Sequence, residues 1–395
     1  MITVAAATKI IEEQVSPLQP VEVVLSQAAG LVLANDVFAT IDIPAFAQSS
    51  MDGYAFSFSG WQVHKTLEIA GEMAAGSNET IPVSPGQAVR IFTGAAVPEG
   101  TDTVVMQEKV STENNLLTIA DENIIAGRNV RPKGSEIKAG ALALAAGTRL
   151  SPAAIGYIAG IGVAKVKVFP KPLVSIIVTG KELQKPGERL EYGQVYESNS
   201  ATLTAALTQL DISSVKICQA DDELEVLTQI LQQAMYESDA VLLTGGISVG
   251  DYDFVLEAAA QCGITKIFHR IKQRPGKPLY FGKKENKLVF GLPGNPSSVL
   301  TCFYEYVLPA LQLLSSHASP GLKTLQVPLA KKIEKATGLT HFLKGYYDGE
   351  KATPLDAQES YRLSSFAHAN CLIKIDEDTA CCDAGEKVEI HLLPE

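Results

Sequence analysis

The chain lacks a long apolar run and an excess of positive charge. Of its 395 residues, 44 are Asp or Glu and 33 are Lys or Arg, so the formal net charge is −11. Non-specific nucleic-acid binding is excluded, because no surplus cations exist to displace counterions. No run approaches the ~20 apolar residues of a spanning helix, and Lys9, Glu12 and Glu13 stand where a secretory signal is apolar. We therefore expect a cytoplasmic protein without a membrane segment.

Metal-binding spacings are also missing. The six cysteines form no C-x-x-C pair and the six histidines no H-x-x-x-H pattern. Zinc-finger proteins are thereby excluded, and neither a protein-bound transition metal nor a Ser–His nucleophile is indicated. A reduced compartment suits such cysteine usage.

What the chain does contain is ample core material, with 46% hydrophobic residues, in a length that predicts two to four domains. From Leu173 to about Ser315, strand and helix patterns alternate, which indicates a parallel sheet with helices on both faces. Short strand patterns over 66–121 and 323–394 predict β-rich parts. The fold class is therefore α/β plus β, in several domains.

A glycine-rich stretch follows the apolar strand that begins at Ala240. Glycines between a strand and a helix turn backbone N–H groups toward an anion. If Asp251 and Asp253 both face such a site, a divalent cation is expected between them and the ligand. The alternative is a tight turn in which Asp253 caps the helix and Asp251 is solvated. The candidate ligand-binding positions are Gly245, Gly246, Ser248 and Gly250.

Two carboxylates follow neighbouring strands of the same region. Glu182 follows the strand over 174–179, and Asp221 follows the strand over 215–218. Asp222-x-x-Glu225 fits a capping box, which leaves Asp221 as the freer acid. Open sheets bind ligands outside the carboxyl ends of their strands, so we expect both carboxylates near the glycine loop.

A basic loop and a Pro/Gly loop complete this region. The first contains Arg270, Lys272, Arg274 and Lys277, for which a solvated basic face is the alternative. The second, Gly291-Leu-Pro-Gly-Asn-Pro296, precedes a helix predicted over 297–315 with a kink at Pro309. Its proline and hydroxyls are ordinary helix-start residues and also suit an oxyanion.

Two polar positions stand out in the N-terminal half. Asp52 begins an Asp-Gly turn, and Thr93 precedes Gly94 in Phe92-Thr-Gly-Ala95. A turn aspartate and a solvated threonine beside a bulge glycine are the alternatives. A polar island over 359–365 contains Ser360.

Taken together, these motifs resemble the molybdopterin molybdenumtransferases, the bacterial MoeA proteins and the E domain of gephyrin. The resemblance runs almost end to end. It rests on the following segments: Ser50-Met-Asp-Gly-Tyr-Ala55, Phe92-Thr-Gly-Ala95, Val105-Met-Gln-Glu108, Gly245-Gly-Ile-Ser-Val-Gly250 with Asp253, Pro275-Gly-Lys-Pro278, Gly291-Leu-Pro-Gly-Asn-Pro296, and Ser364-Ser-Phe366 with Asn370-Cys371.

The resemblance implies four parts and a homodimer with a composite active site. The expected parts are a discontinuous mixed α/β linking domain (16–38 and 140–170), an inserted β-rich domain (39–139), a three-layer α/β/α molybdopterin-binding domain (1–15 and 171–320) and a C-terminal β-barrel domain (321–395). The implied reaction inserts molybdenum from molybdate into adenylylated molybdopterin, with Mg²⁺-dependent release of AMP. A molybdopterin adenylyltransferase is the implied upstream partner. Because the dithiolene sulfurs belong to the substrate, no protein cysteine cage is needed.

Roles carried over by position divide into three groups. Glu182, Asp221 and Asp253 are implied to hold Mg²⁺ and act in catalysis. Asp52 and Thr93 are implied catalytic positions of the β-rich domain. The implied molybdate and substrate contacts are Arg270, Arg274, Lys277, Pro293, Asn295, Pro296, Lys344 and Ser360.

Several positions depart from the family pattern. Lys181 stands where an acid is usual, Arg270 and Arg274 where lysines are usual, Lys344 where an arginine is usual, and Glu136 where an aspartate is usual. Arginine grips an oxyanion in bidentate fashion whereas lysine acts as a point charge, so these exchanges bear on anion affinity. Two other functions stay open: a molybdopterin-binding or scaffold protein without metal insertion, and a molybdopterin adenylyltransferase.

Overall fold

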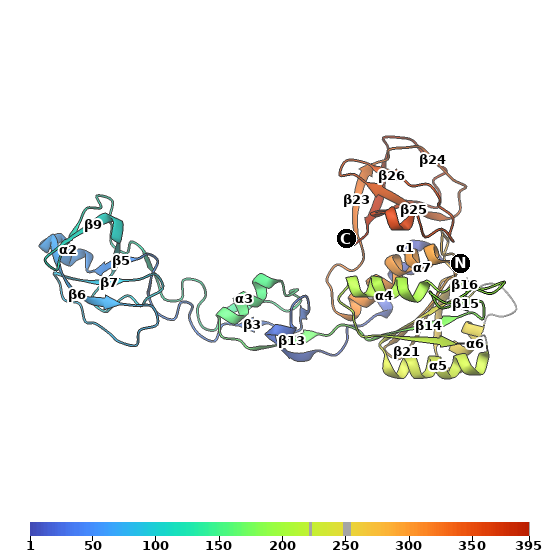
Figure 1. Cartoon of the computed structure of the whole chain (residues 1–395), viewed down its shortest axis with the longest axis horizontal. Coiled ribbons are helices and arrows are strands. Elements are labelled where there is room, and N and C mark those ends of the chain that lie inside the picture. The colour runs from blue at the N-terminus through green and yellow to red at the C-terminus, as the bar shows by residue number, and fades with distance from the viewer. Residues whose placement is uncertain (221–222, 248–253, 395) are drawn as a thin grey trace. The chain divides into compact units, whose positions relative to one another are not determined.

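The computed structural model describes residues 1–220, 223–247 and 254–394. The chain forms two compact units, one containing Met1–Val21 with Phe169–Glu395 and the other containing Glu22–Val168 (Figure 1). The four-part division expected from the resemblance is finer than this and stays a prediction. None of the helices in the described ranges has the length and apolar character that crossing a membrane would require.

A six-stranded sheet forms the centre of the first unit, in the order β17-β14-β18-β22-β21-β19. Its strands are β14 (Val174–Thr179), β17 (Val215–Ala220), β18 (Ala240–Thr244), β19 (Thr265–His269), β21 (Tyr280–Lys284) and β22 (Lys287–Leu292). The neighbours β17, β14, β18 and β22 pair in parallel, as expected. The sheet is nevertheless mixed, because β21 turns directly back into β22 and so pairs with it antiparallel.

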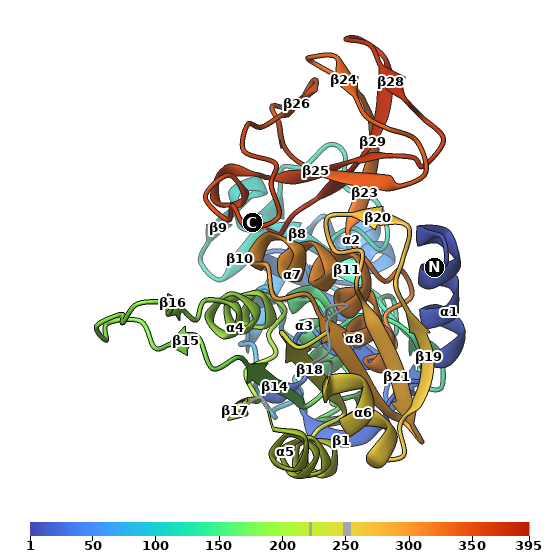
Figure 2. The same ribbon diagram turned by 90° about the vertical axis from the view of Figure 1, so that its right-hand side faces the viewer.

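Helices cover both faces of this sheet, which confirms the three-layer prediction (Figure 2). One face packs against α1 (Val4–Gln14), α4 (Asn199–Gln209), α7 (Pro296–Cys302) and α8 (Leu308–Leu314), and the other against α5 (Leu224–Glu237) and α6 (Phe254–Gln261). Successive side chains of β18 point to opposite faces of the sheet, so both faces carry apolar side chains that helices must cover. Leu242 belongs to the first core and Leu243 to the second, and both are fully buried. Burial of each such side chain contributes about 1.5–3 kcal/mol to the free energy of unfolding.

Two helix predictions need correction. The helix expected from Asp222 begins at Leu224 with Glu223 as its N-cap, which makes no side-chain capping bond; Asp222 lies outside the described residues. The kink expected at Pro309 takes the form of a π-helical stretch, Phe303–Val307, between α7 and α8. Proline lacks an N–H and its ring crowds the carbonyl four residues earlier, and the wider turn accommodates both effects.

The C-terminal part is a second sheet, with the order β20-β25-β27-β29-β23. Its strands are β20 (Gln273–Arg274), β23 (Lys323–Pro328), β25 (Thr340–Tyr347), β27 (Cys371–Ile375) and β29 (Lys387–Leu392); β26 (Ala352–Pro354) pairs with β25, and β24 (Ile333–Glu334) with β28 (Cys381–Cys382). The edge strand β20 comes from the α/β part of the chain and pairs in parallel with β25. This pairing joins the α/β part to the C-terminal sheet within the basic loop.

The second unit contains the expected β-rich segment. A six-stranded sheet with the order β8-β5-β7-β6-β10-β9 packs around two apolar clusters, and a shorter set of strands surrounds α3 (Pro152–Gly160). The larger sheet consists of β5 (Gly53–Phe56), β6 (Thr66–Met73), β7 (Gln87–Ile91), β8 (Thr103–Met106), β9 (Val110–Glu113) and β10 (Leu116–Ile119), with α2 (Phe58–His64) beside it. The smaller sheets pair β1 (Val21–Val24), β13 (Lys165–Phe169) and β2 (Val32–Leu33), then β12 (Leu142–Leu144) with β3 (Val37–Phe38), and β11 (Val130–Arg131) with β4 (Gln48–Ser49).

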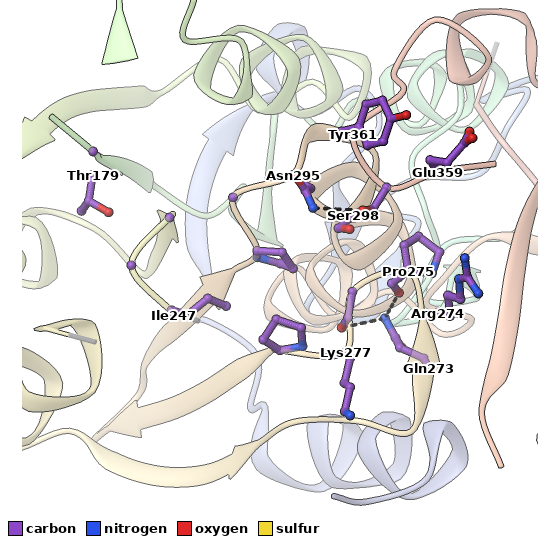
Figure 3. Close-up of a pocket in the computed structure, with 18 of the residues that line it drawn as sticks. Thr179, Ile247, Gln273, Arg274, Pro275, Lys277, Asn295, Ser298, Glu359 and Tyr361 are labelled. Carbon is purple, nitrogen blue, oxygen red and sulfur yellow. Dashed lines mark hydrogen bonds between the residues drawn. The ribbon is translucent and has the colours of Figure 1, made fainter. Parts of the chain in front are cut away.

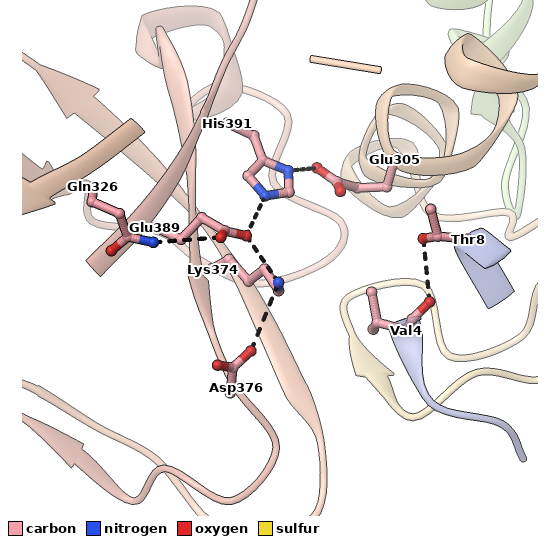
Figure 4. A network of polar contacts seen from close by, with 8 residues as sticks. All are labelled: Val4, Thr8, Glu305, Gln326, Lys374, Asp376, Glu389 and His391. Atoms are coloured by element: carbon pink, nitrogen blue, oxygen red, sulfur yellow. Dashed lines mark hydrogen bonds and ion pairs between the residues drawn. The ribbon is translucent and has the colours of Figure 1, made fainter. Parts of the chain in front are cut away.

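A histidine on β29 joins the C-terminal sheet to the π-helical stretch (Figure 4). His391 Nδ1 lies 2.8 Å from Glu305 Oε1, and its Nε2 lies 3.1 Å from Glu389 Oε1. Lys374 contacts Glu389 at 2.9 Å. Burial lowers the pKa of His391, but the hydrogen bonds and negative charges of Glu305 and Glu389 outweigh burial, so its pKa is raised above 6.5.

This junction predicts a pH-dependent stability. A histidine with a raised folded pKa contributes stability that is complete below its unfolded pKa of about 6.5 and is lost as the pH rises through the folded pKa. The wild-type protein should therefore lose on the order of 1 kcal/mol between pH 6 and pH 9 relative to His391→Gln. Denaturant unfolding of both proteins at the two pH values measures this difference. Parallel pH profiles would contradict the prediction.

Candidate functional site

A cavity of about 720 Å³ lies at the carboxyl ends of β14, β18 and β22 (Figure 3). Its wall includes Thr179 and Gly245 from the strand ends, Arg274 and Lys277 from the basic loop, and Asn295 before α7. Glu359, Ser360 and Tyr361 of the C-terminal part line it as well. The sheet and the C-terminal part therefore share one cavity, at the edge where open α/β sheets bind ligands.

Two glycines let neighbouring strand ends approach closely. Gly245 has φ +87°, and a Cβ on it would lie 2.6 Å from the carbonyl oxygen of Thr179. Gly246 has φ +64° and also lines the cavity. Both positions thus require glycine for backbone reasons. The rest of the predicted loop, including Ser248, Gly250, Asp251 and Asp253, lies outside the described residues.

Glu182 lines the cavity as expected from its place after β14. A Cβ on Gly180 would lie 2.9 Å from both carboxylate oxygens, so glycine there leaves room for the side chain to fold over the strand end. A carboxylate is the hard oxygen ligand that Mg²⁺ prefers, and in this respect the site fits a magnesium ion. Among the residues that the structure describes, no three His, Cys, Asp or Glu side chains form a metal-binding group. Asp221 and Asp253, the other implied ligands, are outside those ranges.

The predicted cations divide into two groups. Arg274 and Lys277 are exposed and line the cavity. Arg270 has φ +87° and does not line it. Its backbone N–H donates to Leu279 O and its carbonyl accepts from Ile2 N, which places Arg270 at the base of the loop whose 274–277 segment lines the cavity. Among the residues that the structure describes, the charged groups lining the cavity are therefore the cations Arg274 and Lys277 and the carboxylates Glu182 and Glu359.

The start of α7 is covered by the C-terminal part. Asn295 Nδ2 donates to Ser360 Oγ at 2.9 Å, and Ser297 N donates to Ser360 O at 3.1 Å. Pro293 and Asn295 line the cavity, whereas Pro296, the first residue of α7, does not. The helix N-terminus that was expected to bind an oxyanion is thus partly occupied by protein. The carbonyl of Ser360 accepts the N–H of Ser297 that an anion would otherwise bind.

Lys344 differs most from its expected place. It is 2% exposed and does not line the cavity. Its Nζ donates to Ala357 O at 2.7 Å and to Arg362 O at 2.9 Å, and lies 3.5 Å from Glu359 O. Burial lowers its pKa, partly offset by the charge of Glu359. The ammonium therefore binds the carbonyls of the 357–362 loop and does not line the cavity.

Asp52 and Thr93 lie together in the second unit. Asp52 Oδ1 accepts hydrogen bonds from Thr93 N at 2.7 Å and from Thr93 Oγ1 at 2.8 Å. These two bonds, with a smaller effect of Arg90, lower the pKa of Asp52. The pair is exposed and Asp52 is ionised at neutral pH. The two motifs, 41 residues apart in the sequence, form one local group.

Sequence reasoning missed several residues that the structure brings to this cavity. Gln273, within the basic loop, lines it. Asn199 at the start of α4 does not line the cavity but donates through Nδ2 to the carbonyl oxygen of the lining residue Gly294 at 2.9 Å. Glu359 and Tyr361 were within the polar island, but nothing in its spacing separated them from Ser360. Gln273 was masked by its cationic neighbours, and Asn199 resembled an ordinary helix-start residue.

The fold and cavity define a class of protein: multidomain α/β proteins with a ligand site at the strand ends and a β domain docked beside it. Three family models match successive parts of the chain. They are described as the MoeA N-terminal region (domain I and II) at residues 2–162, a probable molybdopterin binding domain at 175–313, and the MoeA C-terminal region (domain IV) at 326–393.

Full-length relatives agree with these models. A molybdopterin molybdenumtransferase of Haemophilus influenzae is 34% identical, with 98% of each chain covered, and one of Nostoc is 34% identical over 95% of this chain and 89% of its own. Two structures of a molybdopterin biosynthesis MoeA protein from Pyrococcus horikoshii match with TM-scores of 0.84 and 0.81, at 28% identity and with at least 99% of each chain covered. The chain belongs to the molybdopterin molybdenumtransferase (MoeA) family, which confirms the resemblance.

Proposed function

We propose that this protein inserts molybdenum from molybdate into adenylylated molybdopterin, with Mg²⁺-dependent release of AMP, in molybdenum cofactor biosynthesis. The observation that carries the proposal is the shared cavity, in which two cations, a carboxylate and a glycine-lined strand edge converge in a chain that belongs to this family over its whole length. A molybdopterin adenylyltransferase is the reaction that supplies the substrate. We place the reaction in the cytoplasm.

Each described residue has a task in this proposal. The Gly245–Gly246 turn admits the phosphates close to the backbone, and Glu182 is one ligand for Mg²⁺. When bound, Mg²⁺ offsets phosphate charge. Arg274 and Lys277 attract molybdate and hold it beside Asn295 and Ser360. The substrate's own dithiolene sulfurs become the metal ligands, so the protein needs only to orient and exclude water.

We further propose a homodimer whose sites are composite. Asp52 and Thr93 are exposed, ionised or hydroxyl-bearing, and paired with each other. An exposed polar pair in a separate unit gains a catalytic purpose when it faces a site of a second copy. Two-fold symmetry would then create two equivalent sites.

The proposal is tested by incubating the purified protein with adenylylated molybdopterin, molybdate and Mg²⁺. AMP release and activation of a molybdenum-free molybdoenzyme are measured together. Both should appear, and EDTA should abolish them. Pterin binding without either product would instead indicate a binding or scaffold protein. AMP transfer from ATP to molybdopterin, without molybdenum insertion, would indicate an adenylyltransferase.

Replacing Arg274 by Ala should raise the molybdate concentration for half-maximal insertion about tenfold or more, because a bidentate cation at the cavity wall is lost. Binding of the adenylylated pterin should change far less. Arg189→Ala, an exposed arginine that does not line the cavity, is the control. Equal losses for molybdate and pterin would assign Arg274 to the phosphates instead.

A further inference from the structure

A buried amide lies within the basic loop. Gln273 is fully buried, and its Nε2 donates to Pro275 O at 3.0 Å and to Gly276 O at 3.2 Å (Figure 3). The loop that follows carries Arg274 and Lys277 to the cavity wall. One side chain therefore binds two consecutive carbonyls of the segment that positions both cations.

The orientation of this amide is determined from the opposite side. Tyr306, also fully buried, donates its hydroxyl to Gln273 Oε1. With Oε1 occupied by a donor, Nε2 is the atom that faces the loop carbonyls. Tyr306 lies in the π-helical stretch Phe303–Val307, and such stretches recur at functional sites because they redirect side chains.

The loop packs closely around this amide. Gly276 has φ +85°, and a Cβ on it would lie 2.8 Å from Gln273 Nε2 and closer still to Cys302 Sγ. Cys302 Sγ itself lies 3.5 Å from Gln273 Nε2 and 3.7 Å from Gly276 O. A buried polar group with all its partners satisfied stabilises one arrangement, whereas each lost partner leaves a desolvated group unpaired at a cost in free energy.

We propose that Gln273 and Tyr306 are positioning residues that fix the Arg274–Lys277 loop for oxyanion binding. Neither side chain needs to touch the oxyanion. The π-helical stretch places the hydroxyl, the hydroxyl orients the amide, and the amide holds the two carbonyls between the cations. The inference rests on the proposed function, because it assigns the oxyanion to these cations.

The test uses Tyr306→Phe, which removes one hydroxyl and keeps the ring, and Gln273→Met, which keeps the side-chain length. Both should raise the molybdate concentration for half-maximal insertion about three- to tenfold, with less than about a twofold change in the rate at saturating molybdate. The matched control is Ser175→Ala, which breaks another buried hydroxyl pair, Ser175 on β14 with Ser238 at the end of α5. It should lower stability without changing the molybdate requirement.

Amide hydrogen exchange at 276–277 provides a second measurement that does not depend on catalysis. Exchange there should accelerate in Tyr306→Phe and stay at the wild-type rate in Ser175→Ala. If wild type inserts no molybdenum but exchange accelerates, the proposed function fails and the loop-positioning role stands. If molybdate requirement and exchange are unchanged in Tyr306→Phe, or change equally in Ser175→Ala, the inference is overturned. Should Gln273→Met not fold, Tyr306→Phe alone decides.

Discussion

A mixture of Asp52→Ala and Glu182→Gln chains should recover roughly a quarter of wild-type activity, although each variant alone is expected to lose on the order of a hundredfold. Asp52 belongs to one compact unit and Glu182 to the other. In a mixed dimer with composite sites, one site carries both changes and the other carries neither. About half of randomly assembled dimers are mixed, each with one intact site of two.

The matched control places both changes in one chain and mixes it with wild type. If sites are composite, mixed dimers are inactive, and about a quarter of full activity remains in the wild-type dimers. If each site lies within one chain, about half remains, and the first mixture recovers nothing. Refolding the chains together and measuring AMP release distinguishes these outcomes. Recovery near zero in the first mixture would contradict the composite site.

Replacing Lys344 by Met should lower the free energy of unfolding by about 2–4 kcal/mol, because the buried carbonyls of Ala357 and Arg362 lose their donor. Removing an ammonium that has no carboxylate hydrogen-bonded to it offsets part of this cost. The loop should loosen, and with it the contact between Ser360 and Asn295. Denaturant unfolding and hydrogen exchange over 357–362 measure both effects.

The control is Lys351→Met, an exposed lysine of the same part of the chain, which should leave stability within about 0.5 kcal/mol. Lys344→Arg keeps the charge but adds volume in a buried position, so intermediate stability is expected. One outcome would instead support the molybdate-binding role that the resemblance implies. If Lys344→Met unfolds like wild type and only the molybdate requirement rises, Lys344 is a molybdate ligand.

Local patterns were sufficient for the parallel strands of the α/β sheet, although not for its antiparallel edge. The apolar runs Val174–Thr179 and Ala240–Thr244 form strands that are buried on both faces. Such continuous apolar runs can be predicted as strands from the sequence alone. The edge of the sheet at which the cavity lies could also be predicted, because polar residues and glycines come directly after those strands. Pro309 likewise predicted an irregularity in its helix, but its sequence position did not predict the π-helical form over Phe303–Val307.

The sequence by itself determined the layers, the strand ends at which the cavity lies, the glycine turn and the family. Tertiary structure alone decided which charged groups reach the cavity. Arg274 lines it while Arg270, whose backbone pairs with Leu279 and Ile2 at the base of the loop, does not, and Lys344 is enclosed by three loop carbonyls. Gln273 and Ser360 acquire their roles from partners 33 and 65 residues away. Periodicity reports which face of an element is buried, but the partner of a polar side chain depends on contacts between elements distant in sequence.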